Sequence, residues 1–345
     1  VQRPRVAALV KEDLRALSWL SPLLVGRIPV AALANPPALV ELFGEQIVEE
    51  LDFRLEAENM LDLARIFAAT DQRTMVVPRP HPTLVTRRVL VMERLDGFAF
   101  EDVEAMHAAG IDTALVLRAG LIACLEGALL YGVFHGDLHG GNLVVAPSGR
   151  TVLFDFGITG RLAEPQRLAF LRLLLSGTTG DVRGQLAALR DMGAFPMDTD
   201  IEVVFNDLGL DQPPPDPENI SANELVGELQ ELVKKLLGYG ARAPKDLMLF
   251  VKNLMFLNAA TATLAPDLDL IAEVVNVHTH FTLTHGERIA QDLGEAAISQ
   301  PIDLDSVKAS FLVSPDTERV TFSELQERRR TIIKRMGNAD IKHRS

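Results

Sequence analysis

The segment that most constrains the fold runs from Gly132 to Arg161, with the sequence GVFHGDLHGGNLVVAPSGRTVLFDFGITGR. Two short runs, LVV and RTVLF, flank an Ala-Pro-Ser-Gly turn, which predicts a β-hairpin. Asp137 and Asn142 precede this hairpin and Asp155 follows it. Because a hairpin returns the chain to the end from which it started, we expect these three polar side chains to lie close together at the open end of the hairpin.

These residue types suit phosphoryl transfer, in which catalysis is mainly positioning and neutralisation of negative charge. Asn142 and Asp155 offer the hard oxygen ligands that Mg²⁺ requires. Asp137 can accept the proton of an attacking hydroxyl or orient a water. Each short motif alone is a weak signal, but the ordered set around a hairpin favours one catalytic unit over separate surface loops.

The residues between these groups carry further expectations. Gly157, in the Asp-Phe-Gly motif, is expected to permit a backbone turn that a side chain would obstruct. His135, two residues before Asp137, is expected to order the loop rather than to carry protons. No role is assigned to His139.

Composition sets the outer bounds. The 345 residues are 48% hydrophobic, which indicates one large or two smaller globular domains. The net charge of −13 argues against nucleic acid as a non-specific partner. The single cysteine, Cys124, lies in an apolar helical run, so we expect a core residue and a reducing, cytoplasmic compartment. No uninterrupted apolar run is long enough to predict a membrane-spanning helix.

Three segments near the ends of the chain carry separate expectations. The opening Val-Gln-Arg-Pro is typical of mid-protein sequence, so a fragment is expected. Leu14–Leu33 is apolar but interrupted by Arg and Pro, which indicates a buried or interfacial segment. Arg328–Arg344 holds seven Lys or Arg against one Asp. This stretch is either a frayed basic terminus or a patch that contacts anionic lipid peripherally.

A long helical region is predicted over Ala38–Ala69, where apolar residues recur at helical spacing. Asp52 and Glu56 are four residues apart and would share a face, with Glu50 about 120° away from Glu56. Acidic residues on a helix usually form a solvated face. A phosphoryl-transfer site, however, needs a helix-borne Glu that fixes a phosphate-binding Lys, and this is the only long helix predicted before the one that leads into the loop preceding the hairpin.

Met75–Pro80 and Leu84–Met92 are predicted as strands bounded by prolines. A polar link follows directly, and the backbone groups of Met92, Glu93 and Leu95 could hydrogen-bond an adenine edge. An ordinary strand-to-helix turn has the same pattern. Farther along, Ile111–Val133 is predicted as an apolar helix that leads into the loop before the hairpin, and the chain after Leu162 is almost entirely helical in pattern.

Taken together, these motifs resemble the UbiB (AarF-type) atypical protein-kinase-like family over about residues 1–270. The stretch from Glu50 to Ala57 is the most family-specific, whereas the His-Gly-Asp motif alone would equally suit aminoglycoside or choline kinases. The matching motifs are Glu50-Leu-Asp52-Phe-Arg-Leu-Glu56-Ala, Met92-Glu93-x-x-x-Gly97, His135-Gly-Asp137-Leu-His139-Gly-Gly-Asn142 and Asp155-Phe-Gly-Ile-Thr-Gly160.

The resemblance implies an α+β, protein-kinase-like fold with an incomplete small sheet lobe and a large, mostly helical lobe. The implied domains are a partial small lobe over 1–97, a helical lobe with the catalytic and Asp-Phe-Gly loops over 98–295, and a C-terminal extension over 296–345. It also implies that a phosphate-gripping Lys and a Lys-x-Gly-Gln segment precede Val1. Glu56 would then pair with that Lys, and Glu50 and Asp52 would contact the Lys-x-Gly-Gln segment.

By the same resemblance, the ligands are ATP and Mg²⁺, and the activity is ATP hydrolysis or phosphoryl transfer at Asp137, Asn142 and Asp155. The family is linked to isoprenoid-lipid metabolism of the ubiquinone or menaquinone type, with a membrane surface and lipid-biosynthesis proteins as partners. Two alternatives stay open at this point. One is a small-molecule kinase of the aminoglycoside or choline type, and the other is a pseudokinase that binds nucleotide and serves as a scaffold.

Overall fold

The computed structural model describes residues 1–24, 40, 44, 51–210, 231, 234–311, 313–328 and 330–331. The chain divides into two compact units, which are Val1–Ile111 with Phe134–Gly160, and Asp112–Val133 with Arg161–Ser345. Asp137, Asn142 and Asp155 therefore belong to the first unit, although the sequence placed them in a helical lobe over 98–295. Compact units and kinase lobes are different divisions of a chain, so the predicted domain boundaries stay predictions.

A four-stranded sheet lies at the centre of the first unit. Its members are β1 (Met75–Val76), β4 (Phe98–Ala99), β6 (Leu143–Val145) and β7 (Thr151–Leu153). The order is β1-β7-β6-β4, with β1 parallel to β7 and the other pairs antiparallel. The predicted hairpin is confirmed as β6 and β7, because Leu143 pairs with Leu153 and the Ala146 N–H donates to the Arg150 carbonyl at 2.8 Å.

A second sheet replaces the single strand predicted over Leu84–Met92. It pairs β2 (Pro80–Val85) with β3 (Leu90–Met92), and the chain turns between them. The Thr86 hydroxyl accepts hydrogen bonds from the N–H groups of Arg88 and Val89. A Thr side chain that satisfies nearby backbone donors stabilises a turn in competition with an extended strand. The prediction of one continuous strand was therefore wrong.

The helix α4 (Phe53–Ala69) supplies the buried apolar face of the predicted helical region. Asp52 precedes this helix as its N-cap, with φ −120° and ψ 96°, and its carboxylate accepts from the Arg54 N–H. The prediction that Asp52 and Glu56 share a helical face was therefore wrong. Glu50 lies outside the described residues. The buried side chains of α4 are Ala57, Met60, Leu63, Ile66 and Phe67.

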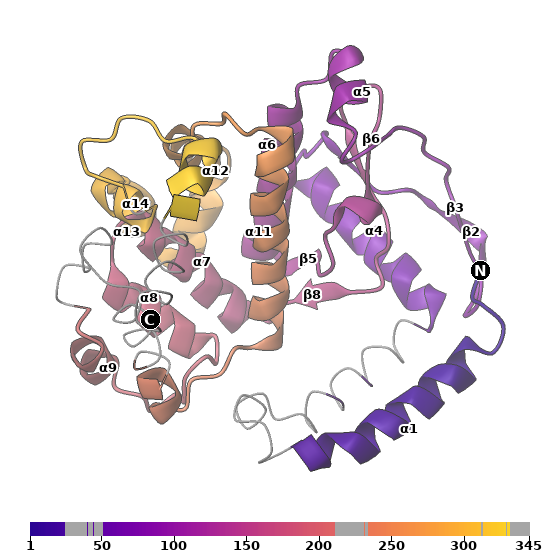
Figure 1. The fold of residues 1–345 in the computed structure, drawn as a ribbon, viewed down its shortest axis with the longest axis horizontal. Coiled ribbons are helices and arrows are strands. Elements are labelled where there is room, and N and C mark those ends of the chain that lie inside the picture. Colours follow the sequence, from indigo (N-terminus) through magenta and orange to yellow (C-terminus); the bar gives the residue numbers. More distant parts are fainter. Residues whose placement is uncertain are drawn as a thin grey trace, which may run out of the picture. The chain divides into compact units, whose positions relative to one another are not determined.

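The strands β5 (Val133–His135) and β8 (Thr159–Arg161) lie side by side as a small separate sheet (Figure 1). A Cβ added at Gly160 would lie 2.2 Å from the Phe134 ring, so only glycine allows this close approach. The remaining elements of the first unit are α1 (Val6–Leu24), α5 (Val103–Ala108) and the 3-10 turn η2 (Gly140–Asn142). Within α1, Trp19 is 71% exposed and Ser21 only 3%, so most but not all of the described part of the predicted apolar stretch is exposed.

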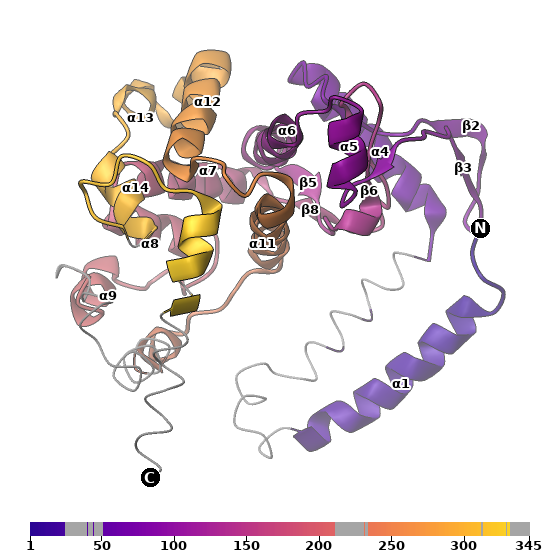
Figure 2. The same cartoon turned by 45° about the horizontal axis from the view of Figure 1, so that its top comes forward.

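The second unit is helical. Its central helix α6 (Thr113–Glu126) continues into a π-helical turn, η1 (Gly127–Tyr131), which confirms the predicted apolar helix to within two residues at each end. This helix lies beside α11 (Lys245–Leu264) in both views (Figures 1 and 2), and the Thr113 hydroxyl donates to the Leu264 carbonyl at 2.5 Å. Further helices among the described residues are α7 (Glu164–Thr178), α8 (Val182–Asp191), α9 (Ile201–Asp207), α12 (Leu270–Leu293), α13 (Glu295–Ser299) and α14 (Leu304–Ser310).

Two arginine side chains donate hydrogen bonds to backbone carbonyls of the π-helical turn. The Leu129 carbonyl accepts from Arg167 Nη1 at 2.9 Å, and the Leu130 carbonyl accepts from Arg288 Nη2 at 3.4 Å. A π-helical turn disrupts the regular helical pattern of backbone pairing. These two guanidinium groups therefore satisfy carbonyls at the end of the helix that leads into β5.

Cys124 lies in the core of α6, as predicted. Burial raises the pKa of its thiol to about 12, although a hydrogen bond with Asn253 acts in the opposite direction. The thiol is therefore neutral and inert at physiological pH.

Two described helices are long and apolar enough to cross a membrane by length and composition alone. They are Thr113–Tyr131, whose window is 61% buried, and Lys245–Leu264, whose window is 33% buried. Core helices of soluble proteins pass the same test. Charged residues such as Arg118 and Lys252 interrupt both runs, which is why the sequence predicted no span there.

Candidate active site

His135 ties the loop after β5 to the segment after β7. Its Nε2 donates to the backbone carbonyls of Asp155 at 2.6 Å and Phe154 at 3.2 Å, and its Nδ1 accepts from the Asp137 N–H at 3.1 Å. Burial lowers the pKa of His135, although the two carbonyl bonds act in the opposite direction. The imidazole is therefore neutral at pH 7 and carries its proton on Nε2. Both ring nitrogens serve the backbone, in agreement with the predicted ordering role.

Asn142 is buried at the start of the hairpin and is oriented from two sides. Its side-chain Nδ2 donates to the Asp137 carbonyl at 3.1 Å, and its own carbonyl accepts from the Phe154 N–H at 2.8 Å. Because Nδ2 is engaged, Oδ1 is the atom of this amide that a cation would take. The hairpin thus brings Asn142 next to both the Asp137 loop and the residue before Asp155, as the sequence predicted.

Asp155 has a left-handed backbone, with φ 58°. This conformation is uncommon outside glycine and is several-fold enriched in Asp and Asn. The bond from His135 to the Asp155 carbonyl helps to hold it. The left-handed residue of this motif is therefore Asp155 and not Gly157, where the sequence had placed the unusual turn. The exposed carboxylate of Asp155 accepts from the Gly157 N–H at 3.4 Å.

Helix α4 holds both backbone groups of Phe156. The Phe156 N–H donates to Glu56 Oε1 at 3.4 Å, and Asn59 Nδ2 donates to the Phe156 carbonyl at 2.9 Å. Glu56 was a sequence candidate, and the structure places it against the Asp-Phe-Gly segment. Asn59 was missed, although its position one helical turn after Glu56 is a signal that the two share a face.

Asp137 follows His135 with its carboxylate partly exposed. The His139 Nε2 lies 3.9 Å from Asp137 Oδ2. The other nitrogen of that ring, Nδ1, accepts from the Gly141 N–H at 3.1 Å and so caps η2. The structure thereby gives His139 a structural role that the sequence left unassigned.

The segment between β3 and β4, which the sequence suggested as the binding site for an adenine edge, lies in the same unit. The Glu93 N–H donates to the Arg79 carbonyl at 2.8 Å, and the Glu93 carboxylate pairs with Arg79. Hydrogen bonds from Arg79 lower the pKa of Glu93. One of the predicted adenine-binding groups is therefore already used, whereas the roles of Met92 and Leu95 stay predictions. A Cβ added at Gly97 would lie 2.4 Å from the Val145 carbonyl, so this glycine lets the link pack against β6.

Asp52 is engaged locally rather than with a distant segment. Its carboxylate lies 2.6 Å from Arg54 Nη2, and this side-chain bond lowers the pKa of Asp52 to about 2. The contact predicted between Asp52 and a Lys-x-Gly-Gln segment stays a prediction, as does that of Glu50.

The donor set at this site fits Mg²⁺. Asn142 offers an amide oxygen and Asp155 a carboxylate, both on the ends of one hairpin, and hard oxygen ligands are what Mg²⁺ prefers. The ion would usually keep several waters and bind substrate phosphates in addition to such residues. The arrangement therefore suits a metal–nucleotide ligand with Asp137 on the neighbouring loop.

Comparison with known proteins identifies the family. The ABC1 atypical kinase-like domain matches residues 1–188, which is more than half of the chain. The chain belongs to the ABC1 atypical kinase-like family. The matched range includes Glu56, Asp137, Asn142 and Asp155, and the match together with the mixed α+β structure confirms the predicted kinase-like fold class.

Several curated proteins resemble this ABC1-family chain. Uncharacterized protein Rv0647c of Mycobacterium tuberculosis is 29% identical over 292 residues, which cover 79% of this chain and 56% of that protein. Protein ACTIVITY OF BC1 COMPLEX KINASE 1, chloroplastic, of Arabidopsis thaliana is 28% identical over 281 residues, covering 79% and 39%. Probable protein kinase UbiB of Vibrio campbellii is 24% identical over 274 residues, covering 78% and 50%. The predicted resemblance is thereby confirmed.

The chain spans about half the length of the curated relatives that it matches. Among solved structures, the Rv3197–erythromycin complex from Mycobacterium tuberculosis matches with a TM-score of 0.46 and 20% identity, covering 76% of this chain and 66% of that chain.

Proposed function

We propose that this chain carries the metal–nucleotide site of an ATP-dependent, kinase-like enzyme of the ABC1 family. Asn142 and Asp155 would hold Mg²⁺, and Asp137 would act on the acceptor oxygen. The observation that carries the proposal is the set of bonds that joins the two loops. His135 bonds to the Asp155 carbonyl and to the Asp137 N–H, and Asn142 bonds to the Asp137 carbonyl.

Each residue has a separable task in this proposal. Bound Mg²⁺ would supply charge neutralisation for the phosphates. Asp137 would accept the proton of a hydroxyl or water, and its carboxylate is partly exposed to solvent. Glu56 and Asn59 hold Phe156, which keeps the adjacent Asp155 in place. Whether the phosphoryl group passes to water, a protein or a small molecule is set by the acceptor that reaches Asp137.

The metal assignment is tested by Asp155→Asn. Calorimetric titration with ATP should show binding that weakens by at least about tenfold without Mg²⁺, and Asp155→Asn should weaken binding in the presence of Mg²⁺ by at least as much. Asp71→Asn is a matched control, because Asp71 is also an exposed aspartate with a positive φ, 53°. Equal affinities with and without Mg²⁺ would refute the assignment.

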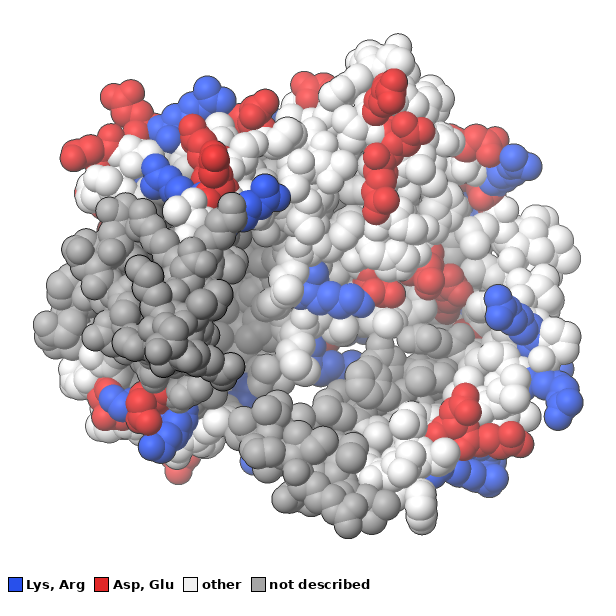
Figure 3. All heavy atoms as spheres, viewed as in Figure 1, with Lys and Arg blue, Asp and Glu red and all other residues white. Residues whose placement is uncertain are grey.

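We further propose that this activity serves isoprenoid-lipid metabolism at a membrane surface. Support comes from the relatives named UbiB and from the exposed apolar side chains on α1, namely Leu9, Leu17, Trp19 and Leu20. Charged side chains of both signs are interspersed on the described part of the face drawn in Figure 3. Apolar contact through α1 is therefore the membrane contact that we favour.

Co-sedimentation with phospholipid vesicles tests this contact. Burial of an aromatic side chain contributes about 1.5–3 kcal/mol, so Trp19→Ala should weaken vesicle binding by about tenfold or more. Leu283→Ala is the control, because Leu283 is also an exposed apolar residue but lies on α12. Binding that survives Trp19→Ala and falls with salt would instead assign the contact to the basic residues that begin at Arg328.

A further inference from the structure

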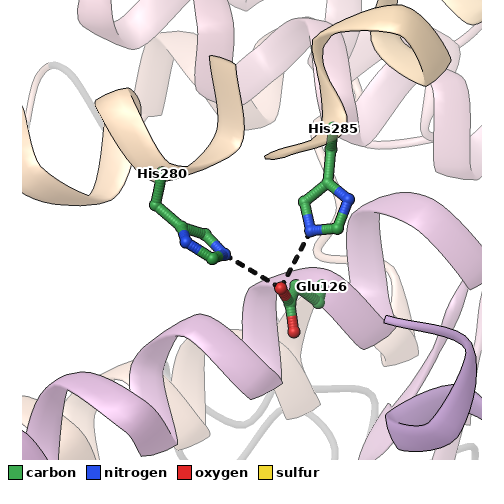
Figure 4. Close-up of side chains that lie close together, drawn as sticks. All are labelled: Glu126, His280 and His285. Carbon is green, nitrogen blue, oxygen red and sulfur yellow. Dashed lines mark hydrogen bonds and ion pairs between the residues drawn. The ribbon is translucent and has the colours of Figure 1, made fainter. Parts of the chain in front are cut away.

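A carboxylate and two imidazoles converge in the second unit (Figure 4). Glu126 ends α6, and His280 and His285 both project from α12. Glu126 Oε1 lies 3.0 Å from His280 Nε2 and 2.9 Å from His285 Nε2. The three ligand atoms all lie within 4.8 Å of one another. None of these residues belongs to the site around Asp155.

The helix geometry lets the two imidazoles approach the carboxylate from different sides. His280 and His285 are five residues apart on one helix, which turns their side chains about 140° from each other. Their ring planes cross at 77°, with centroids 5.6 Å apart. This arrangement differs from stacked rings on one helical face and leaves both Nε2 atoms directed at the same oxygen.

The carboxylate at the centre is deeply buried. Glu126 is 1% exposed, and a buried charge is costly unless a compensating charge or hydrogen bonds accompany it. Both imidazole Nε2 atoms lie within hydrogen-bond distance of its Oε1, so this buried carboxylate is accompanied by two nitrogen ligands.

We propose that Glu126, His280 and His285 bind a divalent transition-metal ion of the Zn²⁺ type. Zn²⁺ binds His nitrogen and carboxylate oxygen at about 2.0–2.2 Å in tetrahedral geometry, which sets ligand atoms about 3.3 Å apart. The Glu126–His280 and Glu126–His285 separations of 3.0 and 2.9 Å need only a few tenths of an ångström of outward movement, and the two Nε2 atoms lie within 4.8 Å of each other.

The donor set separates this ion from the one at the candidate active site. Imidazole nitrogen suits Zn²⁺ and its neighbours among the transition metals, whereas Mg²⁺ takes oxygen ligands. Three protein ligands leave a fourth position for water. His280, whose side chain is 31% exposed, is the most accessible of the three ligands. The ion would connect α6 to α12.

The experiment titrates Zn²⁺ into metal-free protein in excess Mg²⁺, which occupies oxygen-only sites. One Zn²⁺ per chain should bind the wild type, and His280→Gln and His285→Gln should each weaken binding by more than about 100-fold. His278→Gln is the matched control, because it removes a partly buried imidazole from the same helix but outside the cluster, and it should bind Zn²⁺ as the wild type does. Glu126→Gln should also abolish binding.

Two further measurements keep the result decisive. Co²⁺ in place of Zn²⁺ should give visible absorption bands of a tetrahedral site in the wild type and in His278→Gln, but not in His280→Gln. Circular dichroism checks that each variant is folded. If Glu126→Gln does not fold, the Zn²⁺ affinity of His280→Gln decides, because His280 is partly exposed and its replacement should be tolerated. Absence of Zn²⁺ binding by the wild type, or equal binding by all variants, would show a hydrogen-bonded triad and overturn the proposal.

Discussion

At the scale of single residues, the two nitrogens of His135 account for much of the order in the candidate active site. One nitrogen holds the carbonyl of Asp155 and the other holds the N–H of Asp137. The residues with proposed chemistry are thus positioned through their backbones. Asp155 keeps an uncommon backbone conformation in the same arrangement.

The prediction at this scale concerns Asp137. Asp137→Asn keeps the shape of the side chain and removes its charge and basicity, so nucleotide binding should persist while turnover falls by on the order of 10²-fold or more. The measurement is ATP turnover beside calorimetric affinity, for Asp137→Asn and Asp155→Asn in parallel.

Asp155→Asn should show the opposite pattern, with affinity itself reduced. If Asp137→Asn abolished binding while Asp155→Asn spared it, the two roles would be reversed. A wild-type chain that binds Mg·ATP without turnover would favour the nucleotide-binding scaffold instead.

The residues of the site could be predicted from sequence where local spacing determines position. Asp137, Asn142 and Asp155 surround a hairpin whose turn and strands are all encoded within one short segment. Asn59 was not found, because its partner Phe156 lies 97 residues away and the only local signal is the helical face that Asn59 shares with Glu56. Asp52 was misplaced because Asp is favoured both as an N-cap and in the first turn of a helix, and only its backbone angles show which position it occupies.

At the scale of elements, α4 acts on the Asp-Phe-Gly segment through two adjacent turns. Its buried face packs in the first unit, while Glu56 and Asn59 together engage the N–H and the carbonyl of one residue. A small change in the position of this helix would therefore be transmitted directly to Phe156 and to the neighbouring Asp155.

Asn59→Ala tests this connection. It leaves the carbonyl of the buried Phe156 without its side-chain donor, so the free energy of unfolding should fall by about 1–3 kcal/mol. Glu58→Ala is the control, because Glu58 is exposed on the same helix and should change stability by less than about 0.5 kcal/mol. Urea denaturation of both variants gives the comparison, and equal stability of Asn59→Ala and the wild type would count against the connection.

Element boundaries were the part of the fold that the sequence predicted least well. The alternation through Leu84–Met92 has the composition of a strand, and the hydroxyl of Thr86 decides in favour of a turn through two backbone donors. The apolar helix before β5, in contrast, is long and strongly patterned, and its predicted ends were close to those observed.

At the scale of the whole molecule, contacts between residues distant in sequence stabilise the helical unit. Asp292 Oδ2 lies 2.7 Å from Arg167 Nη1 and 3.4 Å from Arg288 Nε, and both arginines also bond to carbonyls of η1. Glu126 meets its two histidines across more than 150 residues. Such partners are set by tertiary packing, so no sequence pattern indicated either cluster.

Asp292→Asn should lower the free energy of unfolding by about 3 kcal/mol at pH 7, because the buried Arg167 loses its carboxylate. Burial acts to raise the pKa of Asp292, but the bond and charge of Arg167, with the charge of Arg288, hold that pKa below its ordinary value of 3.8. The stabilisation is therefore present above pH 3.8 and is lost as the pH falls through the lower folded-state pKa.

Urea unfolding of the wild type and Asp292→Asn at several pH values checks this sign. The difference between them should be constant from neutral pH to about pH 5 and should shrink below pH 3.8. The exposed Asp198 gives the control variant Asp198→Asn, whose stability should follow the wild type throughout. A difference that grew on acidification would contradict the assignment.

The π-helical turn at Gly127–Tyr131 has a consequence for how this chain is compared and altered. A π-turn is equivalent to one extra residue in a regular helix. Because this turn is the last of the helix, removing that residue would rotate the start of the following segment by about 100° about the helix axis and draw it back by about 1.5 Å. The extra residue of the π-turn thus determines the direction in which the chain leaves the helix and enters β5. A relative with a regular helix here should align across this point with a single-residue gap, because no substitution can reproduce the rotation.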